Sequence, residues 1–370
     1  MVDRPRIRDV ASMAGTSAST VSNLLNGRPD RMRPETMARI EEAIERLGYR
    51  PSRTARQLKT GVSQMIGLLV PSVANPFHGA VAWAVEVAAQ ARGFQVVLGN
   101  SLRDPARERS YAGDFFDFGI RGVIAGSSPA DLGHFSELMK RGLSLVAFDL
   151  VTTATGTVPP VDSVSMDNRR AGYLATRHLV ELGHRRIGYI SGATPTMSRR
   201  DRLDGYRQAL NEAGIGSAPR LIAAGIDSAL GDDDTHGAEH GRMAALELLE
   251  LADAPTALVA LNDMHALGAC AAVRDKGGSV PEDVSVVGID DITLASLLAP
   301  PLTTIRHPIE KLSEAAVEIL TQRIAGNDPS GPQHVVFDPH LVVRSSTAPP
   351  GRRGAVRGAR RKAGDRSGRA

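Results

Sequence analysis

Cysteine and aromatic residues are scarce in this sequence. Its 370 residues include one cysteine, Cys270, and only 4% of them are aromatic. A single cysteine excludes a disulfide framework and a zinc site built from several cysteines. With 42% hydrophobic residues but so few rings, the cores must be aliphatic and rich in alanine. We expect Cys270, in an alanine-rich helical stretch, to lie in such a core rather than to act as a nucleophile.

Signatures of catalysis and of membrane insertion are missing as well. The sequence holds no Gly-x-Ser-x-Gly elbow, no Gly-Lys-Ser/Thr phosphate loop and no strong metal-ligand spacing. It therefore predicts no enzyme, no cofactor and no bound metal. No long apolar run or signal-peptide segment occurs, which favours a cytoplasmic protein with no membrane partner.

Positive charge is concentrated at the two ends of the chain. Residues 1–60 carry a net charge of +5 and residues 350–370 one of +7, which leaves −9 for the rest. A basic head and tail on an acidic body indicate that the ends contact a polyanion. The tail alone, rich in Gly and Arg without an apolar period, is more typical of a disordered extension.

The stretch IRDVASMAGTSASTVSNLLNG, residues 7–27, predicts two short helices joined by a tight turn. Apolar residues recur at helical spacing from residue 7 to residue 14. Gly15 can adopt a positive φ and end the first helix, and Ser17 can cap the second. A third helix is expected over Pro34–Leu47, with Gly48 at its end. Three helices with a tight glycine turn predict a helix-turn-helix domain.

The outer face of the second helix is unusual because its residues are small or hydroxylated. Ala18, Ser19, Ser22 and Asn23 are expected to point outward, while Val21 points inward. Small side chains let a helix lie deep in the DNA major groove, and hydroxyl and amide groups can bind phosphates or base edges. The alternative is a small helical bundle with a serine-rich surface.

Residues 7–27 resemble the DNA-binding signature of the LacI/GalR (lactose/galactose repressor) family. The shared features are the D-V-A opening, the A-G turn, the S-x-x-T-V-S run and L-N-G, followed by Leu47-Gly48-Tyr49. The sequence departs from the family at Arg6 and Arg33, where capping Thr and Ser are usual, and at Thr16, where Val is common. It departs also at Asn23, where a base-reading Arg is common. Asn favours adenine where Arg favours guanine, so a different operator is expected.

Residues 51–60 are implied by the resemblance to form a hinge helix that folds on DNA. Leu58 would wedge a base step open in the minor groove, at an unstacking cost offset by the bent DNA. The alternative is an ordinary basic linker. Together, the predicted DNA contacts are Arg6, Ile7, Ser17, Ala18, Ser19, Thr20, Ser22, Asn23, Asn26, Tyr49, Ser52, Arg53, Ala55, Arg56 and Leu58.

From residue 61 short aliphatic strands alternate with helical segments, which predicts an α/β body of parallel sheets. The expected strands are Met65–Val70, Phe94–Leu98, Gly122–Ala125, Ser144–Phe148, Arg186–Ile190, Ala257–Leu261 and Val284–Ile289. Two blocks of similar order predict two lobes with a cleft, and the resemblance implies a periplasmic-binding-protein-like body. The predicted boundaries are a helix-turn-helix head (1–50), a hinge (51–60), a body (61–347) and a tail (348–370). One lobe is expected to comprise 61–161 plus about 293–322, the other 162–291 plus about 323–347.

Ligands of parallel sheets bind beyond the carboxyl ends of the strands. The polar and aromatic residues expected there, which also match the family's effector contacts, are Asn75, Phe77, Asn100, Asp149, Arg202, Asn262 and Asp290. Carboxylates, amides and arginine suit sugar hydroxyls, because each hydroxyl both donates and accepts a hydrogen bond. Asp263 and Asp291 are instead assigned to capping the segments that follow them.

Residues 226–240 are an insertion relative to the family, which usually has a ligand-stacking aromatic residue here. Phe77 or Phe148 are the candidates to replace that platform. His236 and His240, four residues apart and near Asp232–Asp234, have a spacing that could bind zinc on a helix. A solvated acidic loop is the preferred interpretation.

The whole sequence predicts a homodimeric, ligand-responsive transcription regulator. The resemblance, which covers about residues 6–347, implies a repressor of sugar transport or catabolic genes that binds a pseudo-palindromic operator. The alternative is a sugar-binding receptor without a DNA-binding function, since the body of such receptors has the same two-lobed fold.

Overall fold

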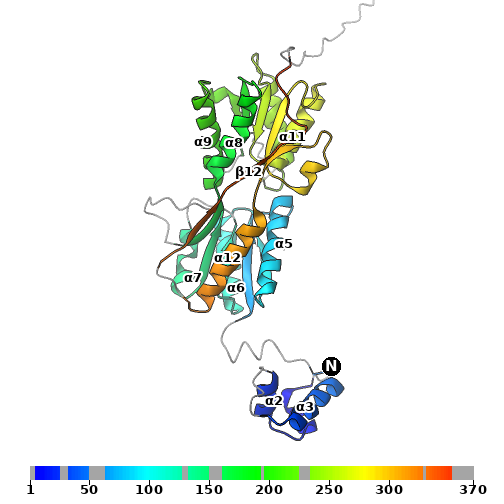
Figure 1. Cartoon of the computed structure of the whole chain (residues 1–370). Coiled ribbons are helices and arrows are strands. Elements are labelled where there is room, and N and C mark those ends of the chain that lie inside the picture. Colours follow the sequence, from blue (N-terminus) through cyan, green and yellow to red (C-terminus); the bar gives the residue numbers. More distant parts are fainter. Residues whose placement is uncertain are drawn as a thin grey trace, which may run out of the picture. The chain divides into compact units, whose positions relative to one another are not determined.

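The structure is a computed structural model that describes residues 5–25, 32–49, 63–126, 132–149, 161–192, 196–224, 234–327 and 331–351. The chain divides into two compact units, the head (Met1–Ser63) and the body (Gln64–Ala370), drawn in Figure 1. Within the described ranges, no helix is both long and apolar enough to cross a membrane.

The described part of the head folds into α1 (Ile7–Met13), α2 (Ala18–Leu25) and α3 (Pro34–Leu47). The predicted glycines after the first and third helices are confirmed, since Gly15 and Gly48 have φ angles of 58° and 59°. The Ser17 hydroxyl accepts the Thr20 N–H at 3.1 Å and so caps α2. The core of the head is aliphatic, with Val10, Ala14, Val21 and Ile40 among its buried residues.

Arg6 and Arg33, which replace the family's usual capping residues, provide no side-chain cap to α1 and α3. The start of each helix is stabilised in another way. The Arg6 N–H donates to the Asp9 carboxylate at 2.6 Å, which satisfies the backbone at the start of α1. Arg33 precedes Pro34, which is the first residue of α3. Proline suits this position because its φ is already helical and it has no N–H to satisfy.

Two six-stranded sheets form the described part of the body. The first contains, in spatial order, β11 (His334–Phe337), β5 (Asp162–Met166), β4 (Ser144–Phe148), β3 (Gly122–Ala125), β1 (Met65–Val70) and β2 (Gln95–Asn100). The second contains β12 (His340–Val342), β10 (Thr303–Arg306), β9 (Ser285–Asp290), β8 (Ala257–Ala260), β6 (Ile187–Ile190) and β7 (Ile222–Ala223). All neighbouring strands are parallel except β10 and β12, which are antiparallel.

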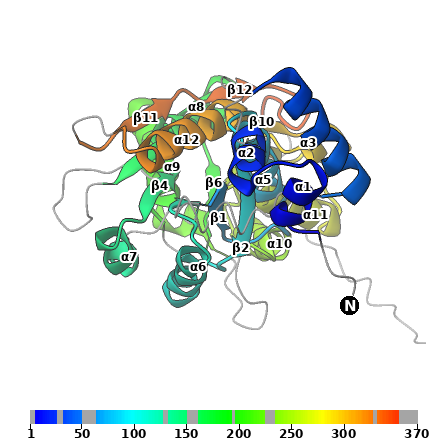
Figure 2. The same ribbon diagram turned by 90° about the horizontal axis from the view of Figure 1, so that it is seen from below.

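Helices cover both faces of each sheet. Those of the first sheet are α5 (Pro76–Ala91), α6 (Pro105–Asp117), α7 (Ser136–Lys140) and α12 (Ile309–Ile324). Figure 2 shows α5 and α12 on one face of that sheet and α6 and α7 on the other. Those of the second sheet are α8 (Asn168–Glu181), α9 (Met197–Glu212), α10 (Gly237–Leu249) and α11 (Asp263–Asp275). Short 3₁₀ turns lie at Gly133–Phe135, Pro219–Leu221 and Thr293–Ser296. We call the first sheet with its helices the N-terminal lobe and the second sheet with its helices the C-terminal lobe.

The predicted division of the chain between the lobes is wrong in three places. β5 belongs to the N-terminal lobe although residues 162–166 were assigned to the other one. β10 belongs to the C-terminal lobe and β11 to the N-terminal lobe, both opposite to expectation. The physical reason is that the chain crosses between the lobes three times, after β5, after β10 and after β11, and the last strand before each crossing still belongs to the sheet of the lobe that the chain is leaving.

The interior of the body is aliphatic, as the composition predicts. Ile66, Leu68, Val146 and Leu258 are fully buried in its largest cluster, and Cys270 packs against that cluster. Burial raises the pKa of the Cys270 thiol to about 11, so the group stays a neutral thiol. The expected core role of this cysteine is confirmed.

Candidate functional site

The exposed face of α2 carries the hydroxyl and amide groups predicted to contact DNA. Ser19 and Asn23 are exposed. The Ser17 hydroxyl lies 2.7 Å from that of Ser19 and 2.8 Å from that of Thr20, so three hydroxyls form one cluster at the start of the helix. Such a cluster at a helix N-terminus has the donors that a DNA phosphate requires.

Three other predicted DNA contacts have a packing role in the head. Ile7, Ala18 and Tyr49 are partly buried and pack against the core of α1, α2 and α3. Ala18 therefore only partly belongs to the outer face where it was expected. Six predicted contacts, Asn26, Ser52, Arg53, Ala55, Arg56 and Leu58, lie outside the described residues.

A second candidate site is a cavity of about 40 Å³ where the two lobes of the body face each other. Six of the seven residues predicted to contact the effector line it: Asn75, Phe77, Asp149, Arg202, Asn262 and Asp290. They come from both lobes and lie near the carboxyl ends of strands, as the rule for parallel sheets predicts.

Asn100 is the predicted effector residue that does not line this cavity. Its side-chain oxygen accepts the Val73 N–H at 2.9 Å and so fixes the loop after β1. A polar side chain at a strand end can also hydrogen-bond to the backbone of a neighbouring loop. The sequence does not distinguish this role from contact with a ligand. The Asn75 and Asn262 oxygens likewise cap α5 and α11, at 3.1 Å from Phe77 N and 3.0 Å from His265 N.

Backbone strain aims two carboxylates into the cavity. Asp149, directly after β4, has a φ of 60°, and Asp290, at the end of β9, has a φ of 127°. Residues other than glycine rarely adopt these angles, which cost of order 1–3 kcal/mol and concentrate at functional sites. The two carboxylates come from opposite lobes, and both line the cavity.

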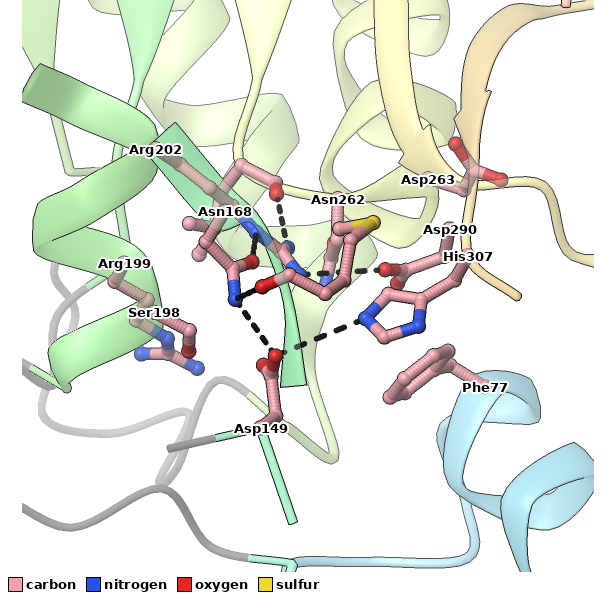
Figure 3. A network of polar contacts seen from close by, with 12 residues as sticks. Phe77, Asp149, Asn168, Ser198, Arg199, Arg202, Asn262, Asp263, Asp290 and His307 are labelled. Carbon is pink, nitrogen blue, oxygen red and sulfur yellow. Dashed lines mark hydrogen bonds and ion pairs between the residues drawn. The ribbon is translucent and has the colours of Figure 1, made fainter. Parts of the chain in front are cut away.

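Asn168 connects these groups, as Figure 3 shows. Its Nδ2 donates to Asp149 Oδ1 at 2.6 Å, and its Oδ1 accepts from Arg202 Nε at 2.7 Å. Arg202 Nη1 also donates to the Leu261 carbonyl at 2.8 Å. Asn168 follows β5, so the strand-end rule could have identified it had β5 been predicted as a strand.

Asp290 faces Arg202 at a distance of 3.7 Å between Oδ1 and Nη2. Burial raises the pKa of the Asp290 carboxyl well above its usual range, although the Arg202 charge opposes this. A carboxyl held near neutrality can donate a hydrogen bond as well as accept one.

Asp263 and Asp291 have clamping roles rather than the predicted capping roles. Asp263 accepts from the Thr304 hydroxyl at 2.5 Å and from the Ile292 N–H at 2.9 Å. Asp291 pairs with Arg306 at 2.7 Å and with Arg344 at 2.5 Å. Both therefore fix β10 and its neighbours in the C-terminal lobe.

His307 is a buried residue of this region that the sequence did not suggest. It follows β10, its ring centroid lies 4.9 Å from that of Phe77, and its Nε2 lies 3.8 Å from Asp149 Oδ1. Burial lowers the pKa of His307 to about 4, so the ring is neutral at neutral pH. The ring lies against Phe77 beside the cavity (Figure 3), and Phe148, the other candidate for an apolar platform, lines the cavity as well.

Two glycines bring α8 and α9, and with them Asn168 and Arg202, into contact. A Cβ atom on Gly172 would lie 1.9 Å from the Arg202 carbonyl oxygen, and one on Gly205 would lie 1.9 Å from the Arg169 carbonyl oxygen. Only glycine permits this approach of two helix backbones. The glycine of the R-L-D-G-Y motif therefore positions the arginine of the same motif.

Asp234 contradicts the expectation of a solvated acidic loop at this position. Its side chain is only 3% exposed and pairs with Arg103, with His78 at 3.5 Å and with Arg199 at 3.5 Å. These four residues and Ser198 also line the cavity. Among the residues that the structure describes, no group of three or more His, Cys, Asp or Glu side chains could hold a metal ion.

A helix-turn-helix head and a two-lobed body with a polar cleft define a DNA-binding regulator with a small-molecule site. Comparison with known proteins agrees. Residues 6–52 match the model of bacterial regulatory proteins of the lacI family, and residues 176–347 match the periplasmic binding protein-like domain.

Similar proteins resemble the chain over nearly its full length. The HTH-type transcriptional regulator DegA of Bacillus subtilis is 33% identical over 347 residues, which cover 93% of this chain and 98% of DegA. The transcriptional regulator CelR, solved in complex with cellobiose, is 33% identical with a TM-score of 0.66. The match covers 93% of this chain and 100% of the CelR chain. The lac repressor dimer bound to operator and the anti-inducer ONPF is 28% identical, with a TM-score of 0.80, and covers 94% of this chain and 100% of its own. The chain belongs to the LacI family of bacterial transcription regulators.

Proposed function

We propose that this chain is a homodimeric repressor whose heads bind a pseudo-palindromic operator and whose cleft binds a sugar or sugar derivative. The observation that carries the proposal is that one chain contains both the exposed hydroxyl and amide face of α2 and the polar cleft of the body. The chain acts by binding and performs no catalysis. It is proposed to control sugar transport or catabolic genes from the cytoplasm.

Support for the DNA-binding role comes from the head. The described contacts that we assign to phosphates and base edges are Arg6, Ser17, Ser19, Thr20, Ser22 and Asn23. The hinge contacts from Ser52 to Leu58 rest on the sequence resemblance alone. The lac repressor, of similar structure, has been solved on its operator as a dimer.

Support for a homodimer comes from exposed apolar side chains on the N-terminal lobe. Trp83 and Val87 on α5 are 63% and 49% exposed, and Leu98 on the edge strand β2 is 36% exposed. Large apolar side chains on neighbouring elements are typical of an interface. A second copy of this chain is the proposed occupant, because a two-fold operator requires a two-fold protein.

Support for a sugar ligand comes from the mixture of groups in the cleft. Asp149 and Asp290 supply oxygen acceptors, Arg202 supplies donors, and Phe77 supplies an apolar surface. Sugars combine hydroxyls that both donate and accept with an apolar ring face. The related CelR has been solved with a sugar, cellobiose.

The two sites are proposed to communicate through the lobes. A ligand in the cleft contacts both lobes, so it favours one arrangement of the lobes over another. It can shift the DNA-binding equilibrium only by its difference in affinity for these two states. The alternative, a sugar receptor without a DNA function, is not favoured because it leaves the head without a role.

The head assignment is tested by Asn23→Asp, with Arg46→Gln as the matched control. Each substitution lowers the net charge by one, but Asn23 is exposed on α2 whereas Arg46 lies in the last turn of α3, paired with Glu42. We expect Asn23→Asp to weaken operator binding by about 30-fold or more, since a base-edge contact becomes a repulsion. Arg46→Gln should have an effect below about threefold.

Fluorescence anisotropy with a labelled operator at fixed salt measures both affinities. Equal losses in the two variants would show that only net charge matters and that α2 does not enter the groove.

A further inference from the structure

The cluster around Asp234 joins both lobes at one side of the cavity. Arg103 binds the Asp234 carboxylate through two nitrogens, one of them Nη2 at 3.1 Å from Oδ1. His78 and Arg199 approach the same oxygen, each at 3.5 Å. Arg103 and His78 belong to the N-terminal lobe and Arg199 to the C-terminal lobe, so one carboxylate is shared by bases from both.

The fold fixes the positions of Arg103 and Arg199, the two arginines of this cluster. Arg103 and its neighbour Leu102 have φ angles of 56° and 52°, which few residues other than glycine adopt. This backbone turns the Arg103 side chain, after β2, into the space between the lobes. Arg199 lies in the first turn of α9 and Arg202 one turn later, on the helix fixed by the glycine contact with α8.

Asp234 is the one of the cavity's three carboxylates that lies on a turn and does not border a core strand. Asp149 and Asp290 border core strands, whereas Asp234 lies on a turn ahead of α10. Its neighbour Thr235 makes one further contact across the cleft, with the Ser72 hydroxyl at 3.3 Å. Asp234 is therefore the carboxylate that can leave the cavity without disturbing a sheet.

The cavity is too small for a sugar while Asp234 occupies it. Its volume of about 40 Å³ has room for only a few water molecules, whereas small-molecule pockets measure about 300 Å³ or more. A ligand must therefore open the lobes and displace side chains. The turn that bears Asp234 is the segment best placed to yield.

Displacement of Asp234 by a neutral ligand would leave its basic partners uncompensated. Arg103 and Arg199 are 13% and 9% exposed, and a buried charge that loses its partner is strongly destabilising. We infer that the effector carries an acidic group, a carboxylate or a phosphate, that replaces Asp234 between Arg103 and Arg199.

This inference rests on the proposed function, because it names the ligand class of the same cleft. The remainder of the ligand lies toward Phe77, Asp149 and Asn262, which suit the apolar face and hydroxyls of a sugar ring. A sugar acid or a sugar phosphate has both parts. Guanidinium groups bind carboxylate and phosphate with the same paired geometry, so the structure leaves these two sources to experiment.

The first experiment tests the anion site without a sugar. Asp234→Asn removes the resident charge, and Asp204→Asn, an exposed carboxylate on α9, is the matched control. Circular dichroism establishes that both variants fold. Inorganic phosphate, compared with chloride at equal ionic strength, should raise the melting temperature of Asp234→Asn by about 3 °C or more and leave the control unchanged. Adding Arg199→Gln to Asp234→Asn should abolish this rise.

The second experiment tests the ligand class on the unmodified full-length chain. Calorimetric titrations compare each hexose with its hexuronate and its 6-phosphate. We expect one acidic form to bind at least about tenfold more tightly than the neutral sugar, and Arg199→Gln to remove that preference. If Asp234→Asn does not fold, this loss of preference in Arg199→Gln remains a sufficient test.

The outcomes separate the inference from the proposed function. Neutral sugars that bind as tightly as their acids would overturn the inference and leave the proposed function standing. Lack of phosphate stabilisation in a folded Asp234→Asn would also overturn it. Phosphate stabilisation without binding of any sugar would support the acidic group and contradict the sugar part of the proposed function.

Discussion

Gly205→Ala is expected to destabilise the C-terminal lobe by about 3 kcal/mol or more, because the new methyl group meets backbone rather than a flexible side chain. Its Cβ would lie 1.9 Å from the Arg169 carbonyl oxygen and 2.6 Å from the Tyr173 nitrogen. Helices α8 and α9 must separate to relieve this overlap. Asn168 and Arg202 would separate with them, so effector binding should be lost as well.

Gly113→Ala is the matched control for this prediction. Gly113 lies within α6, and a Cβ atom there would meet nothing within 4 Å. Alanine has a higher helix propensity than glycine, so this variant should be more stable by about 0.5–1 kcal/mol. Denaturant unfolding followed by circular dichroism measures both. A Gly205→Ala variant as stable as the unmodified chain would show that the two helices do not make the close contact described.

Arg202→Ala is expected to abolish the response to the effector while operator binding persists. The substitution removes the donor to Asn168 Oδ1 and to the Leu261 carbonyl, and it leaves Asp290 without its basic neighbour. The buried Asn168 and Leu261 acceptors lose their donor, which costs about 1–3 kcal/mol and should appear as a lower melting temperature. Effector affinity should fall by about 100-fold or more, since a charged hydrogen bond to the ligand is lost together with its neighbours' positions.

Arg207→Ala provides the control on the same helix. Arg207 is 47% exposed and pairs with Asp204 at the surface, so its loss should change neither stability nor effector affinity appreciably. Operator titrations with and without the tightest-binding sugar of the panel give the response of each variant. Low temperature keeps Arg202→Ala folded during the comparison. A normal response in Arg202→Ala would place the effector site elsewhere.

Local patterns predict the head and the central strands well. The expected bounds of α3, β1, β3 and β4 agree with the structure, because continuous apolar runs and helical spacing are properties of a short segment. The crossing strands were missed because they do not carry such runs. β5 reads DSVSM and β10 reads TTIR, and polar residues interrupt the apolar run that predicts a strand in both.

The residues of the cavity also divide into those that local patterns predict and those that depend on contacts between distant parts of the chain. Six of its residues follow from the rule that ligands bind at strand ends, which requires only the order of strands. The Asp234 cluster does not, since Arg103 and Asp234 are 131 residues apart and meet only when the lobes face each other. Asp234 also belongs to a segment whose acidic composition is typical of a solvated loop, and only the surrounding arginines account for its burial.

The most direct test of the account is selection of bound sites from a random double-stranded DNA pool by the purified full-length chain. The account predicts enrichment of a pseudo-palindrome of about 16–20 base pairs, with two half-sites related by a two-fold axis. Asn23 should impose adenine where an arginine would select guanine. No enriched sequence, either alone or with cell extract added to supply a ligand, would contradict the central claim that this chain is a sequence-specific regulator.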